Sequence, residues 1–202
     1  MSRPVLLLTG FEPFDGEAVN PSWEVARALH GRQVAGWRLC AARLPCAFAT
    51  ALPALHAALD RWQPAAVIAL GLAGSRSAVS VERVAVNLVD ARIPDNAGAQ
   101  PVDVPVQAGG APALFTGLPA ELSLSAGSFV CNQVFYGLMA ALAARPGVRG
   151  GFIHLPPLPA QAARHPQARP LALDAQVQAL RLAAAVVASG AAELAVPGGR
   201  VD

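Results

Sequence analysis

The chain has 202 residues and a formal net charge of +2, with 54% hydrophobic and 14% charged residues. This length suits one domain, the apolar content excludes a disordered chain, and the low net charge argues against a dedicated nucleic-acid binder. The sequence contains no lysine, which excludes P-loop, Schiff-base and Ser–Lys chemistry. Because the chain has few charged residues to cover its surface, we expect some apolar surface to be buried between subunits.

The sequence lacks the motifs that are typical of membrane insertion, secretion and metal binding. Every apolar stretch is broken before the ~20 residues that a membrane helix needs. The apolar run at residues 5–8 is too short for the core of a signal peptide. The cysteines are odd in number and show neither a disulfide framework nor a C-x-x-C pair, and no H-E-x-x-H box occurs. We therefore expect a cytoplasmic protein that needs no metal or cofactor and binds neither membranes nor nucleic acid.

Apolar runs alternate with helical patterns along the chain. Asn20-Pro21 is typical of a helix start, with a capping side chain followed by proline at the first helical position. Strands are predicted at 4–9, 37–44, 65–70, 79–88 and 151–155, and helices at 21–30, 48–62, 129–144 and 171–189. This alternation predicts a single-domain α/β/α sandwich over residues 1–202, with a mostly parallel, twisted sheet.

Residues 90–119 interrupt the alternation. They are rich in proline and glycine and have few periodic apolar positions. Long irregular segments inside a compact domain are usually functional or mobile. We expect residues 93–113 to be mobile, or to be ordered by a neighbouring subunit or by substrate.

Four places qualify as functional sites. In open α/β folds, ligands bind at the carboxyl ends of the strands. The segments 9–16 and 71–76 each follow a predicted strand, and His154 lies near the end of another. The fourth place is Cys131, just inside the start of the predicted helix 129–144.

Cys131 is a candidate nucleophile because of its position on that helix. The free N–H groups and positive dipole of a helix N-terminus favour a thiolate, and the same N–H groups can hold an oxyanion. The alternative is that Cys131 is a small buried core residue, as most free cysteines are. Position alone leaves both interpretations open.

His154 and Glu82 are polar residues within apolar strand sequence. A histidine beside a cysteine can take the thiol proton and later protonate a leaving amine, and a third group must then orient the imidazole. The alternatives are a hydrogen-bonded core histidine and a glutamate that is paired with Arg76 or Arg83.

Four segments together resemble pyroglutamyl peptidases of type I, a family of cysteine exopeptidases. They occur in the family's order and span nearly the whole chain. They are residues 9–14 with 20–22, residues 82–87 with 90–96, residues 128–132, and residues 151–156. The chain departs from the family pattern at Leu72, where glutamine is common, at Asp15, where glycine is common, and at Cys46, where a small residue such as threonine is usual.

The resemblance implies a function and a set of site residues. The triad would be Cys131 as nucleophile, His154 as general base and acid, and Glu82 as the group that orients His154. Arg92 would lie close to the thiol and the oxyanion. The pocket for the five-membered lactam would be formed by Phe11, Phe14, Asn20, Cys46, Leu72, Ile93, Phe129 and Val130.

The implied reaction is hydrolysis of the amide bond after an N-terminal pyroglutamyl residue, through a thioester and without a cofactor. Apolar walls suit a neutral, flat lactam, whose N–H and C=O groups still need polar partners. The resemblance also implies a homotetramer. Two alternatives stay open: a related cysteine amidase acting on other small N-acyl compounds, and a catalytically silent binding protein on this fold.

Overall fold

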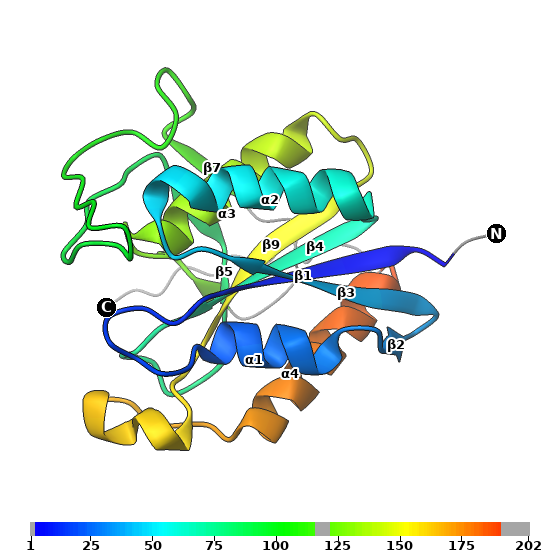
Figure 1. Cartoon of the computed structure of the whole chain (residues 1–202). Helices are drawn as coiled ribbons and strands as arrows, with labels where there is room; N and C mark the ends of the chain where they lie inside the picture. The colour runs from blue at the N-terminus through cyan, green and yellow to red at the C-terminus, as the bar shows by residue number, and fades with distance from the viewer. Residues whose placement is uncertain (1–2, 116–121, 191–202) are drawn as a thin grey trace.

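The computed structural model describes residues 3–115 and 122–190, which form a layered α/β structure around a seven-stranded sheet (Figure 1). The strand order is β2-β3-β1-β4-β9-β5-β8. The strands are β1 (Val5–Phe11), β2 (Gln33–Val34), β3 (Trp37–Leu44), β4 (Ala66–Leu72), β5 (Ser80–Glu82), β8 (Leu122–Ser123) and β9 (Arg149–Leu155). The four long strands β3, β1, β4 and β9 are parallel, whereas β2 and β5 run antiparallel to β3 and β9. The predicted α/β fold with a mostly parallel sheet is confirmed.

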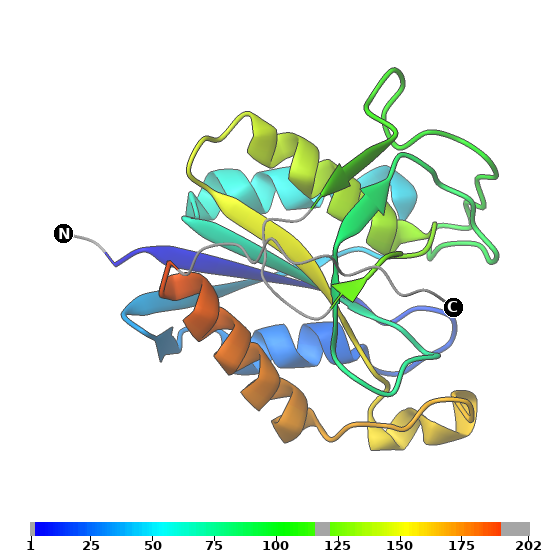
Figure 2. The same ribbon diagram turned by 180° about the vertical axis from the view of Figure 1, so that it is seen from behind.

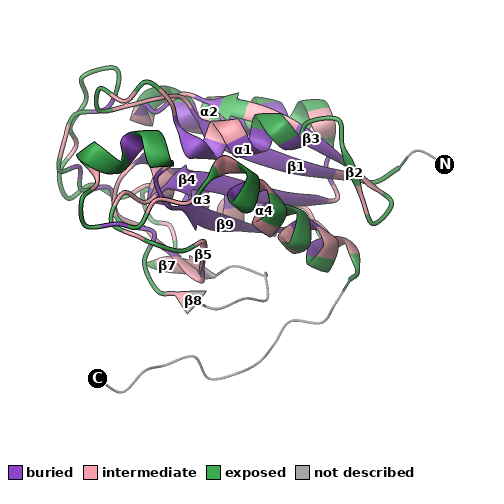
Figure 3. Cartoon of the chain, turned by 90° about the horizontal axis from the view of Figure 1, so that it is seen from below, coloured by how far each residue is buried: buried purple, intermediate pink, exposed green. Residues whose placement is uncertain are grey.

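Helices cover both faces of the sheet. Helices α1 (Pro21–Leu29) and α4 (Leu173–Ala188) lie on one face, and α2 (Phe48–Trp62) and α3 (Val130–Ala143) lie on the other (Figure 1). The strands between them are largely buried, and the outer helix faces are exposed (Figure 3). A 3-10 helix, η1 (Pro159–Arg164), connects β9 to α4. Because both sheet faces are covered, the long strands are continuous apolar runs rather than alternating ones.

Alternation along β4 divides the interior into two cores. Ile68 and Leu70 belong to the core beneath α1 and α4, whereas Val67 and Ala69 belong to the core beneath α2 and α3. Successive strand residues point to opposite faces, so Gly71 faces the α2–α3 side and Leu72 the α1–α4 side. This assignment decides which residues can approach Cys131 on α3.

The strand order changes direction between β1 and β4. The chain leaves β1 through α1 toward β3, and then crosses back through α2 to β4 on the other side of β1. Ligands in open α/β folds bind where the carboxyl ends of strands meet such a switch point. The loops that follow Phe11, Leu72 and Leu155 all leave the sheet at this edge.

The prediction of one strand over residues 79–88 was wrong. The segment divides at Arg83 into β5 and β6 (Val84–Val86), and β6 pairs with β7 (Ala113–Phe115) in a separate two-stranded sheet (Figure 2). Two long-range contacts cause the division, since β5 pairs with β9 while the N–H of Val86 donates to Asn132 Oδ1 over 3.0 Å. The second half of the segment is therefore bound to α3 instead of continuing the main sheet.

The Pro- and Gly-rich segment is organised by local hydrogen bonds. Asp95 accepts from the N–H groups of Phe48, Ala97 and Ala99 over 2.7, 2.8 and 2.9 Å. A β-bridge links Val89 to Val104. Residues 113–115 form β7, so the expectation of irregular structure was wrong there, and residues 116–119 lie outside the described residues. The mobility of residues 93–113 stays a prediction.

Candidate active site

His154 and Glu82 form a buried pair on neighbouring strands. Nδ1 of His154 lies 2.7 Å from Oε1 of Glu82, and their side chains are 5% and 0% exposed. Because β5 runs antiparallel to β9, Glu82 lies opposite Phe152, two residues before His154 on the same sheet face. The ionised carboxylate accepts a hydrogen bond from Nδ1–H, so the Nε2 lone pair of the neutral imidazole is free to accept a proton.

Cys131 is the second residue of α3, at the end of the helix that faces these strands. The helix begins after Phe129, and no side chain caps its first turn. The first N–H groups of a helix have no partner within the helix, so here they remain available near the thiol. The side chain of Cys131 is only partly buried and its thiol is free.

Gly71 brings the thiol and the imidazole into one neighbourhood. It lies opposite His154 in the parallel register of β4 and β9, so both positions face the same side of the sheet roughly 5 Å apart. A Cβ atom at Gly71 would lie 2.8 Å from Sγ of Cys131 and 2.8 Å from Cζ of Phe152. The thiol therefore occupies the space that a side chain at position 71 would fill, beside His154.

Burial and charge give the three groups distinct protonation states. Burial and, to a lesser extent, the Glu82 charge raise the pKa of the Cys131 thiol to about 12, against the opposing effect of a backbone N–H. Burial lowers the pKa of His154 despite the opposing effect of Glu82. Burial would raise the pKa of Glu82, but its hydrogen bonds and the charges of His154 and Arg76 lower it overall. The resting state at neutral pH is a thiol beside a neutral imidazole held by a carboxylate.

Three phenylalanines form an aromatic cluster next to Cys131. The Phe129 ring lies 5.9 Å from Phe14 and 5.2 Å from Phe48, centroid to centroid. All three rings are partly buried and pack, like Cys131, against the core beneath α2 and α3. Such apolar walls around a polar reactive group fit a compact, neutral ligand.

Three further expected pocket residues line the same core but are almost inaccessible. Phe11, Cys46 and Val130 are 1%, 3% and 0% exposed. The first strand was predicted to end at residue 9, which was wrong, because β1 continues to Phe11. Burial, together with the nearby groups Cys131, Glu12 and Asp95, raises the pKa of the Cys46 thiol, so this thiol stays protonated, and its place in the lactam pocket stays a prediction.

The other expected contacts have different surroundings. Asn20 caps α1 by accepting from the N–H and hydroxyl of Ser22, and it donates to the carbonyl of Glu12. The Leu72 side chain faces the α1–α4 side of the sheet, opposite the thiol. Only the backbone groups of Leu72 can therefore contact a ligand beside Cys131. Arg92 is exposed and is not among the groups that shift the pKa of Cys131, and Ile93 is half-buried. Their roles toward substrate stay predictions.

Sequence reasoning missed residues that hold the site together. Asn132, next to Cys131, is fully buried, and its Nδ2 donates to the carbonyls of Val86 and Leu88 over 2.8 and 2.9 Å. Phe48 completes the aromatic cluster. The sequence raised Arg76 only as an ion-pair partner for Glu82, and the structure shows this pair at 2.5 Å in addition to the one with His154.

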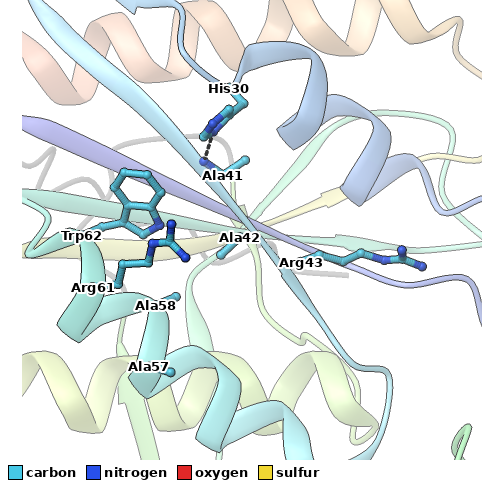
Figure 4. Close-up of a pocket in the computed structure, with 8 residues that line it drawn as sticks. All are labelled: His30, Ala41, Ala42, Arg43, Ala57, Ala58, Arg61 and Trp62. Carbon is cyan, nitrogen blue, oxygen red and sulfur yellow. Dashed lines mark hydrogen bonds between the residues drawn. The ribbon is translucent and has the colours of Figure 1, made fainter.

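An open groove of about 470 Å³ lies elsewhere, at the β3 edge of the sheet (Figure 4). It is lined by His30, Ala41, Ala42, Arg43, Ala57, Ala58, Arg61 and Trp62. None of the three residues of the proposed triad lines it. The Arg61 guanidinium lies 5.2 Å from the centroid of the Trp62 ring, and His30 Nδ1 accepts from the N–H of Ala41 over 2.9 Å.

Within residues 3–115 and 122–190, no group of three or more His, Cys, Asp or Glu side chains is arranged to hold a metal ion. The helices of the same two ranges lack the length and apolarity that would let one span a membrane.

Known proteins resemble this chain over nearly its whole length. Residues 5–190 match the family model described as pyroglutamyl peptidase. A pyrrolidone-carboxylate peptidase from Cupriavidus taiwanensis is 50% identical, over 98% of this chain and 99% of that protein. Another from Chromobacterium violaceum is 55% identical over 88% of this chain and 90% of its own. The crystal structure of pyroglutamyl peptidase I from Bacillus amyloliquefaciens superposes with a TM-score of 0.90 at 41% identity, covering 96% of this chain and all of that one.

Proposed function

The chain belongs to the pyroglutamyl peptidase family, and from this membership and the geometry around Cys131 we propose that it is a cysteine exopeptidase that removes N-terminal pyroglutamyl residues from peptides. The proposal rests above all on one observation. Cys131, His154 and Glu82 converge on one sheet face around Gly71, with His154 held through Nδ1 by Glu82.

The first half of the reaction forms a thioester. Nε2 of His154 takes the proton of the Cys131 thiol as sulfur bonds to the carbonyl carbon of the pyroglutamyl residue. The carbonyl electrons move to oxygen, and the uncapped N–H groups at the start of α3 stabilise the oxyanion. His154 then gives its proton to the departing amine, the C–N bond breaks, and the shortened peptide leaves.

The second half regenerates the enzyme. His154 removes a proton from a water molecule as the water oxygen attacks the thioester carbon. The C–S bond then breaks, and His154 returns the proton to the Cys131 sulfur. Pyroglutamate is released. Glu82 stays ionised throughout and stabilises the imidazolium that forms in each half. No step requires a metal or a cofactor.

The aromatic cluster supports selection for the lactam. A pyroglutamyl residue has no free amine, so its pocket needs no carboxylate for an ammonium group. The rings of Phe14, Phe48 and Phe129 suit the flat faces of the lactam. Its N–H and C=O groups need partners, since leaving each unpaired costs about 1–3 kcal/mol. We assign these partners to backbone groups near Leu72 and to Asn20, and we assign Arg92 and Ile93 to the rim.

Release of amine from a pyroglutamyl chromogenic amide tests this function, with a prolyl amide as the control, both in reducing buffer. The prolyl ring has the same size but carries a charged amine in place of the lactam. Turnover of the pyroglutamyl amide alone supports the proposal. Equal turnover of other small N-acyl amides would instead indicate a less selective amidase.

We also propose that the enzyme works as a homotetramer in the cytoplasm. Its three cysteines are free thiols, and the mechanism needs Cys131 reduced. Leu182 and Val186 on α4 are 70% and 43% exposed, which supports burial of this helix face against another copy. Sedimentation equilibrium tests the assembly, and a monomer at micromolar concentration would contradict it.

A further inference from the structure

Arg76 contacts the carboxylate that holds His154. It follows β4, and its Nη1 donates to Oε1 of Glu82 over 2.5 Å. The arginine side chain is 26% exposed, whereas Glu82 is fully buried. The ion pair therefore connects the solvent edge of the site to its most buried charge.

Both donors use the same oxygen of Glu82. Oε1 accepts from Arg76 and from Nδ1 of His154, whereas Oε2 has no hydrogen-bond partner among the described residues. The position of Oε1 sets the orientation of the imidazole. Without Arg76, the carboxylate is free to rotate partway about its Cγ–Cδ bond, which moves Oε1 and changes the line along which His154 is held.

The second nitrogen of the guanidinium reaches the chain that leads to the nucleophile. Nη2 of Arg76 donates to Oγ of Ser123 over 2.8 Å and to the carbonyl of Ser125 over 2.9 Å. These residues lie at the end of β8 and in the stretch that enters α3, six residues before Cys131 in the case of Ser125. The planar fork of arginine can make all three bonds at once, which the single ammonium of lysine cannot do in the same geometry.

We propose that Arg76 is a positioning residue of the hydrolysis, which fixes the Glu82 carboxylate against His154 and ties it to the segment entering α3. The inference rests on the proposed function for the roles of Glu82, His154 and Cys131. It goes beyond that function because Arg76 acts through Glu82, with its hydrogen bonds going to Glu82, Ser123 and Ser125.

The charge of Arg76 has a separate effect on the base. Burial is the main cause of the lowered pKa of His154, Glu82 opposes it, and Arg76 adds to it. The charged and titratable groups that act on His154 are therefore Glu82 on β5 and Arg76 after β4, with the Cys131 thiol on α3 packed nearby. Loss of the guanidinium charge leaves the Glu82 charge unopposed, so the pKa of His154 rises.

The test uses Arg76→Gln and Arg76→Lys in the full chain, with Arg145→Gln as the matched control. Arg145 forms a 2.6 Å ion pair with Asp60 and is 31% exposed, but it lies beyond the far end of α3. Steady-state kinetics on a pyroglutamyl amide at a series of pH values give kcat, KM and the acidic limb of the pH–rate profile. NMR titration of the His154 imidazole gives its pKa without any substrate.

We expect Arg76→Gln to lower kcat by about tenfold or more, the loss typical of one charge-assisted hydrogen bond, with little change in KM. Its acidic limb and the pKa of His154 move to higher pH. Arg76→Lys keeps the charge and so restores the pKa of His154, but it recovers kcat only in part because it lacks the fork. If thermal unfolding shows that Arg76→Gln is poorly folded, Arg76→Lys alone is the test: its His154 pKa should be native while its kcat is only partly recovered.

Arg145→Gln should keep the native kcat and the native His154 pKa. The inference would be overturned if Arg76→Gln kept both values as well. Equal losses in Arg76→Lys and Arg76→Gln, with the His154 pKa unchanged in both, would reduce Arg76 to a structural residue and overturn it too. If the native chain cleaves no pyroglutamyl amide while the pKa of His154 still responds to Arg76, the proposed function fails and the electrostatic link stands.

Discussion

Oε1 of Glu82 lies 2.7 Å from Nδ1 of His154, and neither side chain is open to solvent. This contact fixes the tautomer of the imidazole, because an ionised carboxylate requires the proton on Nδ1. Nε2 is then left as the acceptor on the side of the α2–α3 core, where Cys131 lies over Gly71. The hydrogen bond therefore sets both the protonation and the direction of the imidazole that we propose as the general base.

The pH–rate profile follows from these protonation states. Burial lowers the pKa of His154, so the neutral base persists below the ordinary imidazole value, and the acidic limb of kcat/KM falls below about pH 6.5. Burial and the Glu82 charge raise the pKa of the Cys131 thiol to about 12, so no loss of the thiol limits the rate near pH 9. We expect a broad plateau from weakly acidic to alkaline pH, measured with the pyroglutamyl amide. A narrow bell centred near neutrality would instead indicate a preformed thiolate–imidazolium pair.

Gly71→Ala tests the contact between β4 and the nucleophile. The added Cβ would lie 2.8 Å from Sγ of Cys131 and 2.8 Å from Cζ of Phe152, so the thiol must leave its present position. We expect kcat to fall at least tenfold and stability to fall by about 1–3 kcal/mol, the usual cost of overpacking a core.

Gly150→Ala is the matched control in β9. Its Cβ would meet a terminal carbon of Leu142 at 2.4 Å, a flexible side chain at the other end of the sheet. Urea unfolding and steady-state kinetics on both variants separate stability from catalysis. If both variants lose stability and both keep kcat, the thiol does not depend on the space above Gly71.

Phe48→Ala tests the aromatic cluster. Phe48 begins α2, and its ring lies 5.2 Å from the Phe129 ring next to Cys131. If the cluster holds the lactam, loss of one ring raises KM several-fold, since an aromatic pair contributes about 0.5–1.5 kcal/mol beyond its buried area. Trp62→Ala, a partly buried aromatic at the other end of the same helix, should leave KM unchanged. Equal KM values for the two variants would remove Phe48 from the pocket.

The long elements were predictable because their patterns are local. The bounds of β3 and α2 agree with the predicted 37–44 and 48–62, and Asn20 caps α1 as its sequence indicated. The short strands β2, β7 and β8 have two or three residues each, too few for any periodicity to appear. The division at Arg83 depends on the buried amide of Asn132, 46 residues from Val86, which no local pattern reveals.

The site was predictable only in part, for a related reason. Cys131, His154 and Glu82 stand out as reactive groups in apolar sequence, and the family motifs assign their roles. Contacts that form only in the folded chain do not stand out. Phe48 looks like any apolar residue at a helix start, and Arg76 is connected to Ser123 and Ser125 across 47 and 49 residues. Leu72 shows the opposite case, because strand alternation turns its side chain away from the thiol.

Turnover of a pyroglutamyl amide by the native chain, Cys131→Ala and Cys46→Ala tests the central claim most directly. Both cysteines belong to or pack against the same core, but of the two only Cys131 lies in the first turn of a helix, beside His154. We expect Cys131→Ala to fall to the level of the uncatalysed reaction and Cys46→Ala to stay within a few-fold of native. Native-like activity in Cys131→Ala would contradict the account.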